Sequence, residues 1–162
     1  MPILWGVYDF QEIPRRSDTL ANALALDYFA RKNGVETIRN INLLPGQVPV
    51  PTGNEYTIRT RNELLDQPEK IFSAFRGNFM DVYDVLNHAR QRNGSIIIMG
   101  TDGADCVKKA TRAARMIFPQ TYIAPDAIHF DLPKPRYIRS LSKQAEEISF
   151  NQAVSLMGGY YA

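Results

Sequence analysis

The protein has 162 residues, of which 44% are hydrophobic and 22% charged, and its formal net charge is +2. This length suits one domain, and we expect residues 1–162 to form a single unit with its own core. The small net charge argues against a nucleic-acid partner, which usually requires a clustered basic excess. No apolar run approaches the ~20 residues that a membrane-spanning helix needs, so we expect no membrane partner.

The sequence contains one cysteine, Cys106, so no internal disulfide can form. A single thiol fits the reducing cytoplasm, where it is either inert core filler or a reactive group. The N-terminus lacks the basic and long apolar regions of a secretion signal and predicts a first strand instead. We therefore expect a cytoplasmic protein.

The first half of the chain predicts a strand–helix–strand unit. A strand over residues 3–8 ends at Asp9, and Ser17 or Asp18 can cap the helix that follows. Asn33 and Gly34 end this helix in a conformation that glycine tolerates, and a second strand covers residues 35–44. Such a unit almost always forms a right-handed parallel crossover.

Residues 45–68 contain four prolines and form the least regular segment, within which residues 55–59 have an extended pattern. A loop this long usually acts as a lid or contacts another subunit. The secondary structure of the short segment 69–75 is ambiguous from its sequence.

The second half alternates again between helices and strands. A helix is predicted from Asn78 to Asn93–Gly94, a strand at 95–99, a helix from Cys106, a strand at 121–124 and a last helix over 140–157. This order predicts an α/β fold, a three-layer α/β/α sandwich around a mainly parallel sheet.

Candidate functional residues fall near the carboxyl ends of the predicted strands, where open parallel sheets bind their ligands. Asp9 ends the first strand, the turn 100–105 ends the strand at 95–99, and Lys70 precedes the segment 72–75. Cys106 comes directly after the segment 100–105 and lies in the first turn of a predicted helix. Unpaired amides and the helix dipole favour the nucleophilic thiolate in such a place. The alternative interpretation is that Cys106 is a small hydrophobic residue buried in the core, with no catalytic role.

The two histidines, His88 and His129, belong to no metal-binding spacing. We therefore expect no metal site and no cofactor.

Five stretches together resemble the isochorismatase-like cysteine hydrolases, a family that includes nicotinamidases and carbamoylsarcosine amidases. The stretches are residues 8–11, 30–35, 70–75, 96–107 and 124–127. Their order and spacing together resemble the family's pattern, with a spacing from Lys70 to Ser73 that is one residue shorter. The resemblance implies that Asp9, Lys70 and Cys106 form a catalytic triad acting as base, electrostatic partner and nucleophile. It also implies an oxyanion hole from the amides of Asp102 and Cys106, and substrate contacts from Gln11 and Phe75.

The resemblance further implies a hydrolase that cleaves a C–N bond of a small amide, imide or carbamoyl compound through a thioester. It implies a small-molecule substrate and a homo-oligomer as well.

The turn before Cys106 departs from the family pattern, because it carries Asp102 and Asp105, whose charges oppose thiolate formation. The nicotinamidase metal ligands are also missing. One alternative is therefore a catalytically inactive member acting as a homo-oligomeric binding or structural protein. Another is a phosphate- or nucleotide-binding module that uses the turn 100–105.

Overall fold

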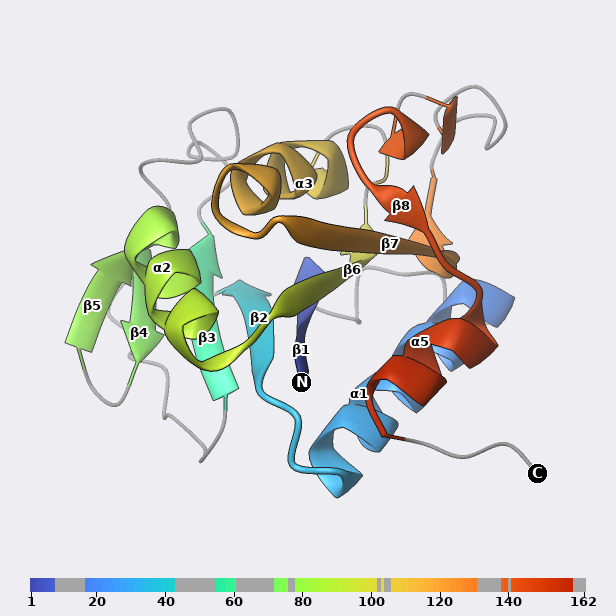
Figure 1. Cartoon of the computed structure of the whole chain (residues 1–162), viewed down its shortest axis with the longest axis horizontal. Helices are drawn as coiled ribbons and strands as arrows, with labels where there is room; N and C mark the ends of the chain where they lie inside the picture. Colours follow the sequence, from blue (N-terminus) through green and yellow to red (C-terminus); the bar gives the residue numbers. More distant parts are fainter. Residues whose placement is uncertain are drawn as a thin grey trace.

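An eight-stranded sheet lies at the centre of the protein, shown as a computed structural model in Figure 1. The structure describes residues 1–7, 17–42, 55–60, 72–75, 78–101, 103, 106–130, 138–139 and 141–158. For residues 39–42, 55–60, 72–75 and 78–82 it describes the backbone. The strands are β1 (Pro2–Val7), β2 (Thr37–Asn42), β3 (Glu55–Thr60), β4 (Phe72–Phe75), β5 (Asn78–Asp81), β6 (Ser95–Thr101), β7 (Gln120–His129) and β8 (Glu146–Glu147).

Most of the sheet is parallel. The strand order is β5-β4-β3-β2-β1-β6-β7-β8, and all neighbours from β3 to β8 run in the same direction. At the other side β4 is antiparallel to both β3 and β5. The prediction of a mainly parallel sheet is therefore confirmed, with an antiparallel extension at one side.

The helices cover both faces of this sheet, which makes three layers (Figure 1). They are α1 (Asp18–Lys32), α2 (Val82–Arg92), α3 (Cys106–Ile117) and α5 (Phe150–Leu156). Helices α2 and α3 pack on one face, and α1 and α5 pack on the other. None of the helices within the described ranges is long and apolar enough to cross a membrane.

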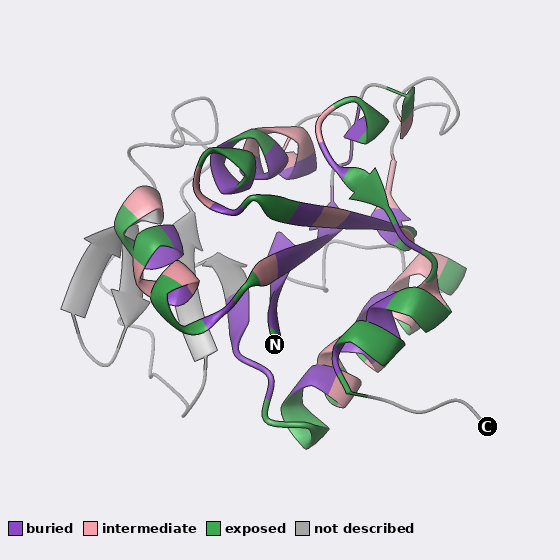
Figure 2. Cartoon of the chain, viewed as in Figure 1, coloured by how far each residue is buried: buried purple, intermediate pink, exposed green. Residues whose placement is uncertain are grey.

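The central strands supply side chains to two separate core clusters. On β1, Ile3 and Trp5 pack towards α2 and α3, whereas Leu4 between them packs towards α1. Strand β6 alternates in the same way along its run of buried apolar residues. Figure 2 shows both strands buried and the outer faces of the helices exposed. Continuous apolar strands are typical of sheets covered on both faces, as the sequence of β6 indicated.

The predicted caps of α1 are confirmed. The Ser17 side chain accepts a hydrogen bond from the Leu20 amide at 3.2 Å. At the other end Asn33 is the C-cap, and Gly34 follows with a φ of 68°, which glycine adopts without steric cost. The short turn then delivers β2 parallel to β1, with Leu4 opposite Thr37.

The helix predicted to begin at Asn78 begins at Val82 instead, so that prediction is wrong by one turn. Residues 78–81 form β5, in which Phe79 lies opposite Ala74 of β4. Pairing with a neighbouring strand outweighs the helical spacing of the apolar residues here. The extended pattern at residues 55–59 is confirmed as β3, while the rest of segment 45–68 lies outside the described residues.

The helix predicted over residues 140–157 is also wrong, because β8 interrupts it. Glu146 lies opposite Tyr122 of β7, and α5 starts only after Ser149. The Ser149 side chain accepts from the Gln152 amide at 3.1 Å, and the Gln152 side chain accepts from the Ser149 amide at 2.8 Å. This reciprocal pair is a capping box, which fixes the start of α5.

Strand β7 is longer than predicted and contains an irregularity. Ile98 of β6 pairs with Ile123, but Gly100 pairs with Ile128, so extra residues of β7 are accommodated between these two pairs. The strand then continues to His129, which lies opposite Thr101 at the end of β6. The irregularity therefore extends β7 to the carboxyl edge of the sheet, beside the turn that leads to Cys106.

Candidate active site

Cys106 is the first residue of α3, and it is half-buried. The preceding strand β6 ends at Thr101, so the helix starts at the carboxyl edge of the parallel sheet. The Cys106 side chain packs against the core cluster shared by α2 and α3. A thiol in this place lies at the start of a helix without being fully enclosed in the core.

The turn before Cys106 begins with a close contact between two strands at Gly100. This residue has a φ of 124°, and a Cβ there would lie 2.0 Å from the carbonyl oxygen of Val7. Both the backbone conformation and the approach of β1 require glycine at this position. The start of the turn is therefore held against the end of β1.

Gly103 is held against the opposite neighbour, β7. Its amide donates to the carbonyl oxygen of His129 at 2.8 Å. A Cβ on Gly103 would lie 2.3 Å from Cε1 of Phe130, so the Phe130 ring packs directly on this backbone. Phe130 and Cys106 both border the core cluster on the α2 and α3 face. The turn is thus anchored to β1 at one end and to β7 in its middle.

Most of the other predicted site residues lie outside the described part of the chain. These are Asp9, Gln11, Lys70 and Asp102. The backbone of Phe75 belongs to β4, and β3 and β2 lie between β4 and β1 in the sheet.

The described residues next to the predicted triad share one edge of the sheet. Val7, the last residue of β1, lies opposite Gly100 and precedes Asp9 by two positions. Strand β4 starts at Phe72, two positions after Lys70, opposite Arg59 near the carboxyl end of β3. The chain thus leaves β1, enters β4 and enters α3 at the same edge.

Within the described ranges, no group of three or more His, Cys, Asp or Glu side chains is arranged to hold a metal ion. His88 lies on α2 and His129 ends β7.

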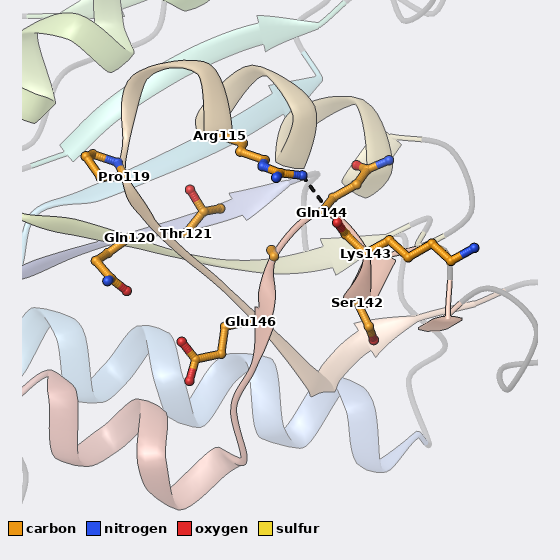
Figure 3. Close-up of a pocket in the computed structure, with 9 residues that line it drawn as sticks. Arg115, Pro119, Gln120, Thr121, Ser142, Lys143, Gln144 and Glu146 are labelled. Atoms are coloured by element: carbon orange, nitrogen blue, oxygen red, sulfur yellow. Dashed lines mark hydrogen bonds between the residues drawn. The ribbon is translucent and has the colours of Figure 1, made fainter.

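Two surface cavities of the described residues lie away from Cys106. One of about 400 Å³ is lined by Arg115, by the start of β7 and by residues 142–146 (Figure 3). The other, of about 300 Å³, is lined by Pro125, Asp126 and residues 147–149.

The anchoring role of Phe130 was missed in the sequence. Phe130 follows an apolar strand and carries no motif, and its contact with Gly103 joins two segments distant in the chain. The glycine at position 103 is the only local signal, and glycine is common in turns for other reasons.

Several solved structures share this architecture. An isochorismatase-like hydrolase from Alkaliphilus metalliredigens matches with a TM-score of 0.66 and 11% identity, covering 96% of this chain and 99% of that one. A cysteine hydrolase from Pseudomonas syringae pathovar phaseolicola matches with a TM-score of 0.64 and 13% identity, covering 99% and 93%. The chain has the isochorismatase-like fold.

The N-carbamoylsarcosine amidase from Thermoplasma acidophilum matches this chain with a TM-score of 0.59 and 12% identity, covering 92% of it and 95% of the amidase. By sequence alone, no family model and no curated protein matches the chain. The likeness therefore lies in the fold. This fold is the one that the resemblance of the five short stretches predicted.

Proposed function

We propose that this isochorismatase-like protein is a hydrolase that cleaves a C–N bond of a small amide, imide or carbamoyl compound. In this proposal Cys106 is the nucleophile, Asp9 the general base and Lys70 their electrostatic partner. The observation that carries it is the shared edge: Val7, Phe72 and Cys106, which adjoin or form the triad, all lie at the carboxyl edge of the sheet.

The position of Cys106 supports its role as nucleophile. The first residues of a helix have amides without intrahelical partners and lie at the positive end of the helix dipole. Helix α3 has 12 residues, long enough for that dipole to develop, and Cys106 is its first residue. Both effects favour thiolate, the reactive form of cysteine.

Chain length allows Asp9 to reach the same place, whereas Lys70 has a longer distance to cover. Asp9 is two positions beyond Val7, and Val7 lies beside the Gly100 end of the turn to Cys106. Lys70 starts farther away, because β4 is three strand spacings of about 4.8 Å from β1. Two residues of extended chain span up to about 7 Å, and the long lysine side chain extends the reach.

The reaction follows from these roles. Asp9 accepts the thiol proton, and the Cys106 sulfur attacks the carbonyl carbon to form a tetrahedral oxyanion. When the C–N bond breaks, Asp9 returns the proton to the leaving amine, which leaves a thioester on Cys106. Asp9 then removes a proton from water as the water attacks the thioester. When the C–S bond breaks, Asp9 passes this proton to the sulfur, which releases the thiol and the acid product.

The turn before Cys106 would supply the oxyanion hole, with the amides of Asp102 and Cys106 as donors. Such donors lower the barrier only when they are held still before the charge develops. The anchors at Gly100 and Gly103 on either side of Asp102 meet this need, since each is fixed to a neighbouring strand. Gln11 and Phe75 are the proposed substrate contacts.

The test combines alkylation of Cys106 with an activity screen. The protein is incubated with iodoacetamide, and the rate is compared with that of free cysteine at the same pH. Primary amides, cyclic imides and N-carbamoyl amino acids are then screened for release of amine or ammonia. We expect faster alkylation than in free cysteine, turnover of at least one compound, and loss of turnover in Cys106→Ala.

Substitution of the proposed base gives a second reading of the mechanism. Asp9→Asn should lower kcat by roughly 10²–10⁴-fold, the usual contribution of a general base. Asp18→Asn is the matched control, because Asp18 begins α1, which packs on the opposite face of the sheet from α3, and its loss should leave kcat unchanged. Slow alkylation together with no turnover would instead favour a binding or structural role for this fold.

A further inference from the structure

The cavity in Figure 3 lies at the amino-terminal edge of the sheet, opposite the edge that carries Cys106. Its floor contains Gln120 and Thr121, the first two residues of β7, and Glu146 of β8. Arg115 reaches it from the last turn of α3, nine residues beyond Cys106, which is about 14 Å along the helix axis. The cavity is therefore separate from the proposed active site.

The charged side chains that line the cavity are Arg115 and Lys143, which are positive, and Glu146, which is negative. Figure 3 shows Arg115 on the α3 side and Glu146 on the β8 side, with Thr121 between them. The Arg115 guanidinium donates through Nη1 to the carbonyl oxygen of Lys143 at 3.2 Å, which fixes its direction. Among the described residues no carboxylate forms an ion pair with it, so its remaining donors are available to a ligand.

Glu146 differs from the next residue in how its carboxylate is used. Glu147 accepts a hydrogen bond from the Ser142 hydroxyl at 2.8 Å. The exposed Glu146 carboxylate has no hydrogen bond or ion pair within the part of the chain that the structure describes. Glu146 can therefore accept a cation or N–H donor from a ligand without breaking an internal contact.

A third feature is an unsatisfied amide at the wall. Oε1 of Gln144 is buried and has no hydrogen-bond partner among the described residues. Buried acceptors are normally satisfied, so the lining of the cavity contains an oxygen that still lacks a donor.

We propose that this cavity binds a small zwitterion, an amino acid whose carboxylate pairs with Arg115 and whose ammonium group pairs with Glu146. A guanidinium pairs with a carboxylate through two parallel hydrogen bonds, which suits the free donors of Arg115. The volume of about 400 Å³ lies within the usual range of small-molecule sites, roughly 300–1,000 Å³. The polar lining favours a charged ligand over an apolar one.

The test is calorimetric titration with glycine, β-alanine and 4-aminobutyrate, whose charges are separated by increasing lengths. Propionate and propylamine are the single-charge controls. We expect at least one amino acid to bind at least about fivefold more tightly than either control. A factor of about five is the most that one exposed ion pair usually contributes. Equal affinity for the amino acids and the controls, or no saturable binding, would overturn the proposal.

Matched variants assign the binding to the two charged groups. Glu146→Gln should weaken amino-acid binding and leave propionate binding unchanged, whereas Arg115→Gln should weaken both. Glu147→Gln is the control, because that carboxylate is already bonded to Ser142 and should not affect binding. If Glu147→Gln weakens binding and Glu146→Gln does not, the proposed site is wrong.

Two further measurements separate this site from folding and from catalysis. Circular dichroism of each variant establishes that it is folded, and Arg115→Lys, which retains the positive charge, should keep part of the affinity. Cys106→Ala should bind the amino acid as the unaltered protein does, because the two sites lie at opposite edges of the sheet. Loss of binding in Cys106→Ala would place the amino acid in the active site and overturn the proposal.

Discussion

At the scale of single residues, two glycines shape the turn before Cys106 for different physical reasons. Gly100 has a left-handed φ and faces the backbone of Val7, which cannot move without disturbing β1. Gly103 faces the ring of Phe130, a partly buried side chain that packs against the core. The first contact is therefore with backbone, and the second is with a side chain.

Because the contact at Gly103 is with a side chain, its cost can be measured in a double-mutant cycle. Gly103→Ala should lower the free energy of unfolding by about 1–3 kcal/mol, the usual cost of overpacking. In a Phe130→Ala background the ring is gone, so the same substitution should cost much less. Urea unfolding of the four proteins gives the coupling energy.

The matched control is Gly94→Ala, because a Cβ there meets nothing within 4 Å. Its effect should be within about 0.5 kcal/mol, as for most surface substitutions. Additive penalties for Gly103→Ala and Phe130→Ala would mean that the ring does not hold the turn.

The sequence predicts the parts of this site that depend on interactions between residues close together in the chain. The start of α3 at Cys106 follows from local signals, an apolar strand, a glycine and an amphipathic segment, and it is confirmed. The Phe130 ring on Gly103 could not be predicted, because it depends on the path of β7 past its irregularity. The roles of Asp9 and Lys70 stay predictions.

At the scale of elements, the packing of residues 141–157 explains why the single long helix predicted from helical spacing does not form. Leu141 and Ala145 belong to the core cluster on the α2 and α3 face, whereas Ile148 and Ala153 belong to the cluster on the α1 and α5 face. The segment therefore crosses from one face of the sheet to the other, and β8 makes the crossing. A continuous helix could pack on one face only.

The restart of the helix after this crossing depends on the capping box at Ser149. Ser149→Ala removes the acceptor for the Gln152 amide and should lower the free energy of unfolding by about 1 kcal/mol. Ser155→Ala, on the exposed side of the same helix, should be neutral or slightly stabilising, because alanine is the better helix former. Thermal unfolding of both variants measures the difference.

The capping interpretation fails if the two serine variants have the same stability. Helix α5 has seven residues, so its first turn is a large part of it and the cap is felt throughout. Asp126 contributes at the same end, since its carboxylate accepts from the Phe150 amide at 3.1 Å. Ser149→Asp should therefore retain the cap yet place a second negative charge near Asp126.

At the scale of the whole molecule, the sheet lies between two cores. Each central strand contributes the side chains of one face to one core and those of its other face to the other core. Ile97 and Met99 of β6 serve the α1 and α5 side, while Ile96 and Ile98 serve the α2 and α3 side. Loss of packing on either side therefore loosens strands that the other side needs. The three-layer arrangement was predictable from alternation of elements, but the assignment of each helix to a face required the strand order.

This sharing predicts one cooperative unfolding transition for both layers. Leu26 on α1 and Leu86 on α2 are each fully buried, in different clusters. Leu26→Ala and Leu86→Ala should each lower the free energy of unfolding by about 2–5 kcal/mol, the usual cost of a buried leucine. Leu24→Ala is the control, since Leu24 on the same helix is 47% exposed and should cost far less. Urea unfolding followed by tyrosine and tryptophan fluorescence and by circular dichroism should give coincident single transitions for all three variants, because β1 and β6 belong to both cores. Separate transitions in either buried variant would mean that the two layers unfold independently and that the shared strands do not couple them.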